Sequence, residues 1–402
     1  MKKTLLASSI AALALSSSVS VHAESFDDIV KGSSVDLNFR FRTESADLDN
    51  AKDAALANTL KSRLTFKSGE YAGVSVVIEG DNVFHITDDF DDKENGNTEY
   101  NVVLDQETTQ FNQAYAQYNG FDSTVKLGNQ RILLDNQRHV GGVGFRQDEA
   151  TFDAVSIKNT SIENLIIFAA IANNRNFITN ANTEESISLL NAKYKVSDDL
   201  AATAYYYGID DVYNAATGAT NTGVDLDTFG IRAVGKASGF GYEAELATQN
   251  KTTAAGGDFS SLYYHIAGSK KIADIKATIG IETFGSDDGA AAFGTPLGTN
   301  HKFYGWSDTF LTGAGNNGIQ NLYASAVTKV SGVKLVGQYH NFTSVEGSDP
   351  LGNEFGFVAA KKFGQYGASL KVAHYIASDF AENLAKPKVD TTKVWLTATA
   401  KF

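Results

Sequence analysis

The sequence predicts an all-β protein, a transmembrane antiparallel β-barrel of about 18 strands. Three observations support this fold class: apolar and polar side chains alternate in segment after segment, short connections alternate with long ones, and the chain ends on an aromatic residue. A strand in a barrel wall needs such alternation, because one of its faces meets lipid and the other faces the lumen.

The N-terminal segment, residues 1–23, is predicted to be a cleaved signal peptide. Lys2 and Lys3 precede an apolar run, and Val21-His22-Ala23 has the small residues of a secretory cleavage site. The apolar run is shorter than the roughly 20 residues that a membrane-spanning helix needs. We therefore predict cleavage before Glu24 and a single barrel domain over residues 24–402.

The composition excludes several classes of protein. The chain has 402 residues, no cysteine and a formal net charge of -13. Without cysteine there is no thiolate nucleophile and no cysteine zinc site. The acidic balance argues against nucleic-acid binding, because affinity for phosphate backbones depends on a basic surface.

The alternation of apolar and polar side chains begins at residue 35. Through residues 35–44, apolar side chains alternate with Asp36, Asn38, Arg40, Arg42 and Glu44. The segments 58–67, 227–234, 242–249 and 275–282 repeat the pattern. A single alternating strand also fits a soluble sheet that packs one face on a core. The prediction of a barrel therefore depends on the repetition of this pattern in many segments.

The connections between these segments alternate in length, as expected for short periplasmic turns and long extracellular loops. Eight short and nine long connections imply about 18 strands with both chain ends on the periplasmic side. We place the short turns near 68–73, 119–123, 158–164, 196–199, 235–239, 271–273, 329–332 and 362–365. We place the long loops near 45–56, 84–109, 133–151, 173–183, 209–226, 250–260, 285–318, 343–352 and 376–390.

The last strand places Val394, Leu396, Ala398, Ala400 and Phe402 on one face. A strand that ends the chain on an aromatic residue resembles the signal read by the outer-membrane assembly machinery. The alternative is an edge strand of a secreted β-sandwich. The barrel interpretation implies lipid and lipopolysaccharide as neighbours.

Strand phase also predicts which charges face the lumen. Basic side chains from two neighbouring strands form one wall: Arg40, Arg42, Lys61, Arg63 and Lys67. Carboxylates project into the same lumen from other strands: Glu79, Asp81, Glu243 and Glu245. Two interpretations remain open. Opposed walls would set a transverse field that selects solutes, whereas ion pairs would only hold the wall together.

The connection 133–151 is the predicted constriction loop. Its candidate residues are Arg138, His139, Arg146 and Gln147, and Gly141, Gly142 and Gly144 are expected to permit tight turns. Folded inward, its arginines would narrow the channel and attract carboxylates, whereas an outward surface loop is the alternative.

The connection 285–318 is longer still. It carries Tyr304 and Trp306, which either stack on sugar rings or pack the loop down.

An acidic run in one outer loop contains Asp88, Asp89, Asp91, Asp92 and Glu94. It does not fit a calcium-binding EF-hand loop, because Lys93 falls where a ligand is needed. We interpret the run as solvated charge, with lipopolysaccharide bridged through divalent ions as a further role. No metal site and no cofactor are predicted.

Catalysis has little support in the sequence. There is no Gly-x-Ser-x-Gly, phosphate-loop or His-Glu-x-x-His motif, and the histidines are scattered singly. We predict that the protein is not an enzyme. An outer-membrane lipase or protease and a non-conducting structural or adhesive barrel remain as alternatives.

A family resemblance rests on short motifs. These are Gln113-Ala114-Tyr115-Ala116-Gln117-Tyr118, Leu127-Gly128-Asn129-Gln130-Arg131-Ile132, Asp135-Asn136-Gln137-Arg138, Gly141-Gly142-Val143-Gly144-Phe145-Arg146-Gln147 and His301-Lys302-Phe303-Tyr304-Gly305-Trp306-Ser307-Asp308. They resemble the alginate-export-type porins of Gram-negative bacteria.

This resemblance implies a single-chain, 18-stranded outer-membrane pore with infolded loops. It also implies passive diffusion of small hydrophilic solutes, with anionic compounds and saccharides as candidates. Whether the barrel is a monomer or a trimer stays open.

Overall fold

The computed structural model describes residues 26–214, 218–220, 223–384 and 387–402. The signal peptide predicted for residues 1–23 lies outside the described residues, so it remains a prediction.

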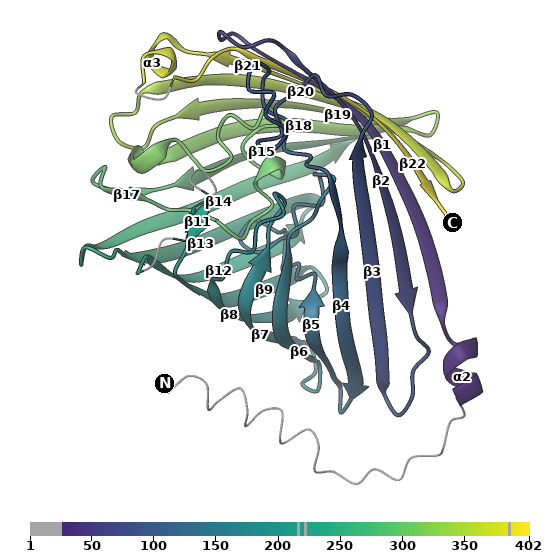
Figure 1. Ribbon diagram of the computed structural model, residues 1–402. Coiled ribbons are helices and arrows are strands. Elements are labelled where there is room, and N and C mark those ends of the chain that lie inside the picture. The colour runs from purple at the N-terminus through teal and green to yellow at the C-terminus, as the bar shows by residue number, and fades with distance from the viewer. Residues whose placement is uncertain (1–25, 215–217, 221–222, 385–386) are drawn as a thin grey trace.

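Within the described residues, 18 strands form a single antiparallel sheet. Each of these strands pairs with the one before it and the one after it in the chain, which gives an up-and-down order (Figure 1). The strands are β1 (Ser34–Leu48), β2 (Ala55–Lys67), β3 (Val74–His85), β4 (Thr108–Gly120), β5 (Ser123–Gln130), β6 (Thr151–Asn159), β7 (Leu165–Asn176), β8 (Ser186–Ser197), β9 (Leu200–Asp210), β12 (Asp225–Ala237), β13 (Phe240–Thr252), β14 (Asp258–Ile272), β15 (Ile275–Phe284), β18 (Ile319–Val330), β19 (Val333–Thr343), β20 (Pro350–Phe363), β21 (Tyr366–Ala377) and β22 (Thr391–Lys401).

Minor elements lie outside this sheet. They are the helices α2 (Phe26–Lys31) and α3 (Asp379–Glu382), the strand pairs β10 (Tyr213–Asn214) with β11 (Ala219–Thr220) and β16 (Ser286–Asp287) with β17 (Ala291–Ala292), and the 3-10 turns η1 (Asn300–Lys302) and η2 (Gly315–Asn317). Among the described residues, no helix has the length and apolar character needed to cross a membrane.

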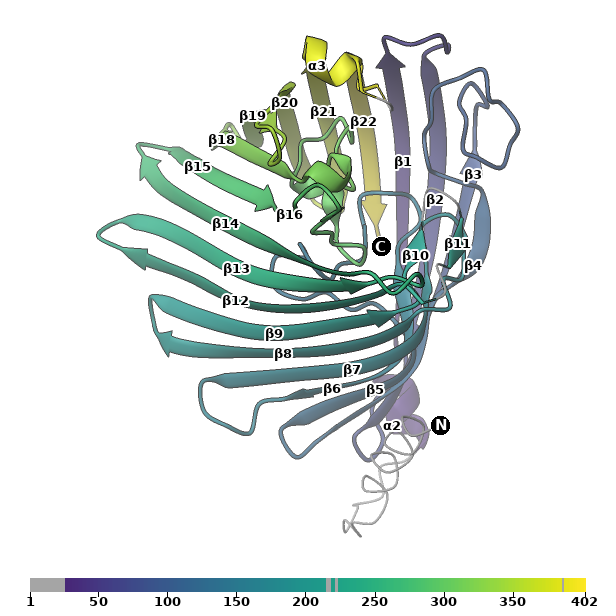
Figure 2. The ribbon, with the colours of Figure 1, turned by 90° about the vertical axis from the view of Figure 1, so that its left-hand side faces the viewer.

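The sheet closes on itself where β1 meets β22 (Figure 2). The two strands pair from Asn38 opposite Lys401 to Leu48 opposite Thr391. The backbone N–H of Phe402 donates to the carbonyl of Leu37 at 2.8 Å, and the Leu37 N–H donates back at 3.0 Å. A spanning sheet must close in this way, because unpaired backbone groups cost several kcal/mol each in hydrocarbon. The predicted fold class is confirmed.

The connections have the predicted alternation of lengths. Two residues join β4 to β5, and two join β18 to β19, whereas residues 86–107, 131–150 and 285–318 form long connections at the other end. β1 starts and β22 ends at the end of the barrel that carries the short turns. Both described ends of the chain therefore lie on the predicted periplasmic side.

The outer face of the barrel is apolar. Phe111, Ile231 and Ile279 are 72%, 62% and 68% exposed, and many other large apolar side chains share their phase. The next residue after Ile231 points inward, because Arg232 pairs with Glu243 and Glu245 on the lumen side. This exposed belt is what a lipid-facing wall requires, since in a bilayer it is covered by acyl chains.

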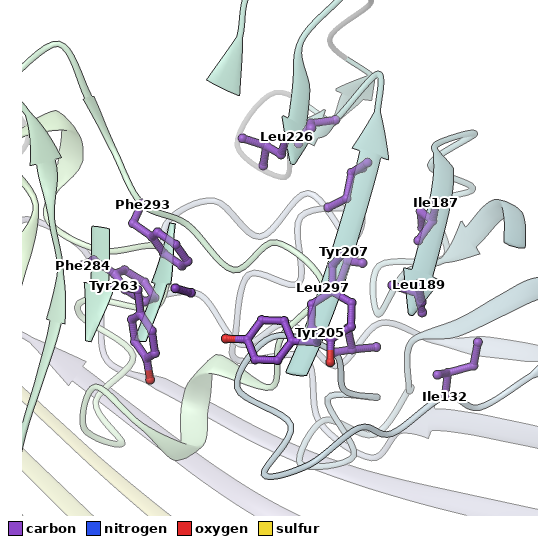
Figure 3. Close-up of a cluster of buried hydrophobic side chains, with 14 of the residues drawn as sticks. Ile132, Ile187, Leu189, Tyr205, Tyr207, Leu226, Tyr263, Phe284, Phe293 and Leu297 are labelled. Carbon is purple, nitrogen blue, oxygen red and sulfur yellow. The ribbon is translucent and has the colours of Figure 1, made fainter. Parts of the chain in front are cut away.

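Part of the interior is a packed core. Tyr205 on β9, Tyr263 on β14 and Phe284 on β15 point inward and are buried together with Phe293 and Leu297 of the connection 285–318 (Figure 3). The rings of Tyr263 and Phe293 stack with centroids 5.3 Å apart. Burying each such side chain stabilises the fold by roughly 1.5–3 kcal/mol. The long connections are therefore held against the inner wall.

We expect Ile279→Arg to destabilise the barrel by about 2–4 kcal/mol, because Ile279 points outward midway along β15, where a charge would meet hydrocarbon. The control is Thr278→Arg, which places the same side chain in the lumen. Urea unfolding in lipid vesicles measures both free energies of unfolding. Equal losses for the two variants would contradict the assigned strand phase.

Candidate functional site: the loop-narrowed lumen

The connection 131–150 folds into the lumen. Arg146 Nη1 donates to Glu44 Oε2 on β1 at 2.9 Å, and Arg138 Nε donates to Glu282 Oε1 on β15 at 2.6 Å. These carboxylates face inward from separate parts of the wall, so the connection crosses the lumen. The outward loop considered from the sequence is not what the structure shows.

His139 ties the same connection to a third part of the wall. Its Nε2 lies 3.0 Å from Glu245 Oε1 on β13, and the Tyr205 hydroxyl donates to the same carboxylate at 2.8 Å. The neighbouring Glu243 accepts a hydrogen bond from Arg232 Nε at 3.2 Å, and Arg232 Nη2 lies 2.8 Å from the same carboxylate oxygen. Glu243 and Glu245 therefore face the lumen and are both paired.

Arg138 is completely buried inside the barrel. Its guanidinium carbon lies 4.4 Å from the ring centroids of both Phe284 and Tyr304, and the Glu282 carboxylate neutralises its charge. Desolvated contacts of this type with aromatic rings contribute about 2 kcal/mol. Arg138 is therefore an anchor of the loop, and Tyr304 packs the loop down rather than facing a solute.

The glycines of this connection act differently from the prediction. Gly141, Gly142 and Gly144 do not have positive φ angles, whereas Val143 does, at 51°. Gly141 is needed for close approach instead, because a Cβ there would lie 2.2 Å from Thr299 Oγ1. Its N–H donates to the carbonyl of Leu297 at 2.8 Å, so the two infolded connections meet backbone to backbone.

Gln147 joins the connection to the basic wall. Its side chain accepts from Arg40 Nε at 2.7 Å and donates to Thr59 Oγ1 at 2.8 Å. Arg40 also donates to the carbonyls of Gly144 and Arg146. The N–H groups of the Arg40 guanidinium thus donate hydrogen bonds that hold the loop. Only part of the Arg40 side chain is exposed to the lumen.

Arg42 is buried next to Arg40. Its Nη1 lies 3.7 Å from Asp105 Oδ2, and its guanidinium carbon lies 4.4 Å from the centroid of the Phe145 ring. Its Nε and Nη1 make no hydrogen bond with any described residue. Arg42 is therefore a structural cation behind the loop.

Lower on the same wall, Arg63 makes a forked pair with Asp81. The two N···O distances are 2.7 and 2.6 Å, and Lys61 Nζ lies 2.8 Å from the same carboxylate. Asp81 sits directly opposite Arg63 in the β2–β3 register, as Glu79 sits opposite Thr65. Of the two interpretations left open by the sequence, ion pairs within the wall describe Glu79 and Asp81, because adjacent strands bring these carboxylates next to the basic side chains.

Two further members of this charge network, Arg131 and Glu149, escaped the sequence analysis. Arg131 Nε donates to Glu149 Oε2 at 2.5 Å, and its Nη2 donates to Glu79 Oε1 at 3.0 Å. Arg63 Nη1 donates to Glu149 Oε1 at 2.8 Å. Arg131 follows the last residue of β5, where alternation no longer applies, so only the path of the loop reveals its position. By contrast, Lys67 at the end of β2 is exposed and makes no ion pair with a described residue.

Neighbouring carboxyl groups of the connection have opposite pKa shifts. Burial raises the pKa of Asp148 to about 6, and its Oδ2 has no described hydrogen-bond partner. Burial acts on Glu149 in the same direction, but Arg63, Arg131 and Lys61 outweigh it and lower the pKa of Glu149 to about 2. Between pH 5 and pH 7, Asp148 changes its charge and Glu149 does not.

The connection 285–318 is joined to the first one through Asp308. Its Oδ2 accepts from Arg146 Nη2 and from Lys393 Nζ, each at 3.2 Å, and its Oδ1 lies 2.5 Å from His301 Nδ1. Burial lowers the pKa of His301 to about 3, so its ring is neutral at pH 7. The neutral ring donates from Nδ1 to Asp308 and accepts at Nε2.

Lys371 on β21 fills a cage of aromatic rings between the two connections. Its Nζ donates to His301 Nε2 at 2.5 Å. It lies 4.4 Å from the centroid of Phe145, 4.3 Å from Trp306 and 5.2 Å from Trp395. One ammonium group therefore fastens both loops to the wall. Trp306 contacts this lysine of the wall and so packs the loop down, which is the second of the two roles considered from the sequence.

The acidic run in the connection 86–107 is partly buried. Asp91 and Asp92 are 1% and 3% exposed, and Asp91 Oδ2 pairs with Lys93 Nζ at 2.8 Å. Asp92 Oδ1 accepts the backbone N–H groups of Glu94 and Asn95. In the described part of the chain, no three potential metal ligands gather at one point.

We expect Lys371→Met to loosen both connections, because methionine fills the cage but cannot donate to His301. The barrel should lose about 2 kcal/mol of stability, and single channels should conduct more current with larger fluctuations. The control is Lys361→Met on the outward face of β20. A variant with unchanged conductance and noise would show that the cage does not hold the loops.

The raised pKa of Asp148 predicts a pH dependence of stability. The folded state favours the protonated carboxyl, so stability should rise as the pH falls from 7 through about 6 toward the ordinary value of 3.8. Asp148→Asn should remove this contribution. Urea unfolding of both proteins at pH 7 and pH 5 measures it, and equal changes with pH in the two proteins would refute the assignment.

The comparisons with known proteins agree with this architecture. No curated protein matches the sequence. Among solved structures, OpdO of Pseudomonas aeruginosa has a TM-score of 0.67 at 12% identity and covers 94% of this chain and 99% of its own. OccK9 (OpdG) of the same organism has a TM-score of 0.70 at 13% identity, covering 93% and 99%. OccAB1 of Acinetobacter baumannii has a TM-score of 0.68 at 14% identity, covering 96% and 100%.

At these identities the solved structures establish a shared fold. A sequence match to a family is independent of them: the alginate export family model covers residues 33–377. The predicted family and outer-membrane location are confirmed, and the predicted channel function is supported. Because the match spans most of the chain, the protein belongs to the alginate export family.

Proposed function

We propose that the protein is an outer-membrane channel through which small hydrophilic solutes diffuse passively. The observation that carries this proposal is the contrast between the two faces of a closed barrel. The outer face is apolar, whereas the inner face carries charged networks around two infolded connections. A lumen lined in this way stays hydrated, as conduction of polar solutes requires.

Anionic solutes and saccharides are the candidates that the lumen favours. Arg131 is partly exposed, and a guanidinium group can offer a carboxylate two parallel hydrogen bonds. Most of the other charges in the narrow region are already paired. We infer that the paired network sets the shape of the passage and that Arg131 meets the solute.

A barrel enzyme remains the second candidate class. His301 and Asp308 form the buried acid–imidazole pair that a hydrolase would need, but both ring nitrogens of His301 are occupied, by Asp308 and by Lys371. The Ser307 hydroxyl is bonded to Glu354 rather than to His301. This arrangement supports a structural role for the pair and a non-enzymatic protein.

Planar-bilayer recording separates the candidate functions. A channel gives discrete current steps from the purified protein, and swelling of loaded vesicles then ranks neutral sugars against carboxylates of equal size. Hydrolysis of ester or peptide substrates without current steps would favour the enzyme. Neither signal, with a correctly folded barrel, would favour a structural or adhesive protein.

Neutralising Arg40, Arg42 and Arg63 together, as Gln, should shift the reversal potential in a salt gradient toward cations. The substitutions remove one cationic partner from each of Asp81, Asp105 and Glu149, so the lumen loses three positive charges. Lys361→Gln on the outer face is the matched control. An unchanged reversal potential in the triple variant would remove these arginines from selectivity.

The C-terminal residue is proposed to serve assembly. The Phe402 ring is 55% exposed on the outer face and lies edge-on to Phe39 and Tyr366, with centroids 6.5 and 6.2 Å away. An exposed terminal aromatic ring is available to the outer-membrane assembly machinery.

The number of barrels in the assembly is a separate question. Crosslinking in membranes would decide between monomer and trimer.

A further inference from the structure

The outer face of the barrel has a shallow hollow of about 430 Å³. It spans the seam of the barrel, from β19 through β20, β21 and β22 to β1 (Figure 2). Its outward-facing lining includes Phe41, Lys361, Ala368, Leu370, Leu396 and Ala398. The alanines and the lysine lie within three residues of the strand ends that carry the short turns. The hollow therefore faces the periplasmic leaflet of the membrane.

The register of the strands explains why the surface is hollow here. Four outward positions lie opposite one another on successive strands: Phe41, Ala398, Ala368 and Lys361. Neighbouring strands are about 4.8 Å apart, so the backbones of Phe41 and Lys361 are roughly 14 Å apart. Only the methyl groups of two alanines cover the sheet between them.

Larger side chains close the hollow at both ends along the strands. Toward the centre of the membrane, Leu370 lies opposite Leu396. Toward the periplasm, Tyr366 lies opposite Phe363, at the level where barrels carry an aromatic girdle. The hollow thus has an apolar floor, an aliphatic end in the hydrocarbon and an aromatic end at the interface.

Lys361 stands at the rim of the hollow without a charged partner. Among the described strand residues, Lys361 and Lys270 are the two lysines that strand phase turns outward. Lys361 Nζ lies 5.3 Å from the centroid of the Phe363 ring and makes no ion pair with a described residue. Of these two lysines, Lys361 lines the hollow and Lys270 does not.

A second copy of the barrel is a poor occupant for this hollow. In the periplasmic half of each described strand, aspartate and glutamate occupy inward positions only: Asp36, Glu79, Glu243 and Glu245. A second wall packed here would therefore present no carboxylate to Lys361. Burying an ammonium group without a partner is strongly unfavourable.

We propose that the hollow binds an anionic glycerophospholipid of the periplasmic leaflet. One acyl chain lies on the floor formed by Ala368 and Ala398, and the phosphodiester meets Lys361 at the rim. A glycerol headgroup leaves the phosphate its net negative charge, whereas a choline headgroup brings its own cation. The site lies on the outer face, so the proposal does not depend on conduction through the lumen.

The test measures which lipid lies next to the hollow. The chain has no native cysteine, so Leu335→Cys, directly opposite Ala359 of the lining, carries a single bimane fluorophore. Vesicles of phosphatidylcholine contain a fixed fraction of lipid with brominated acyl chains, as phosphatidylglycerol or as phosphatidylcholine. Bromine quenches bimane on contact, so the two curves give the relative affinity.

We expect phosphatidylglycerol to bind next to Leu335 about fivefold more tightly than phosphatidylcholine, the factor that one lysine contributes beside an anionic lipid. The preference should weaken as salt rises. The matched reporter is Ile157→Cys, which points outward near the periplasmic end of β6. It should show no preference.

Lys361→Gln should reduce the preference next to Leu335 to that next to Ile157, whereas Lys361→Arg, which keeps the charge, should retain it. Lys270→Gln removes a charge from the same end of the barrel, over the ring of Phe240, and should have no effect. Ala368→Leu with Ala398→Leu fills the floor but keeps Lys361. This double variant should also lose the preference, because the acyl chain no longer fits.

Equal preference next to Leu335 and Ile157 would overturn the proposal, as would a preference that survives both Lys361→Gln and the filled floor. Protection of the Leu335 reporter from both brominated lipids, together with disulfide-linked dimers of Leu335→Cys, would assign the hollow to a second copy instead. Loss of the preference in Lys361→Gln and in the filled floor, with Lys361→Arg and Lys270→Gln unchanged, supports the lipid site.

Discussion

The need to pair every backbone N–H and C=O within a lipid bilayer underlies the whole architecture. A sheet in hydrocarbon cannot leave an edge open, so β1 must meet β22, and the pairing continues to Leu37 and Phe402 at the last residue of the chain. Closure then assigns every side chain of the wall to one of two environments. Apolar side chains are tolerated outside, and charged ones inside, without any change in backbone geometry.

Closure with 18 strands creates a second problem, because the enclosed space is too wide for wall side chains to fill. The connections 131–150 and 285–318 occupy part of it. They are held by buried charges that find partners across the lumen, such as Arg138 with Glu282 and Asp308 with Arg146. Breaking a buried pair by removing one partner is strongly destabilising, so each of these pairs also locks the position of its loop.

The charges of the lumen fall into two groups with different physical roles. In the narrow region they are paired and largely buried, and they define the shape of the passage. At the periplasmic mouth, Lys236, Lys276 and Lys334 are exposed and make no ion pair with a described residue, so they keep a long-range field. The charges that shape the passage and the charges that keep a long-range field thus lie at different depths along the pore. In the narrow region the charges nearly balance, whereas the lysines at the mouth are all positive.

The sequence by itself determined the barrel, its approximate strand count and the phase of the strands with the clearest alternation. These follow from local rules: the period of two decides which side chains face lipid, and turn residues mark where strands end. It also placed Arg40, Lys61, Glu245 and the other wall charges on the inner face. Only the tertiary structure decided which charges meet, because strand phase carries no information on the reach of side chains or the path of loops. Asp81 opposes Arg63 through register, Arg131 joins the network from outside any strand, and Gly141 serves close approach rather than a turn. The β2–β3 hairpin brings Asp81 to Arg63, whereas the paths of the infolded connections bring together the residues of the other two contacts.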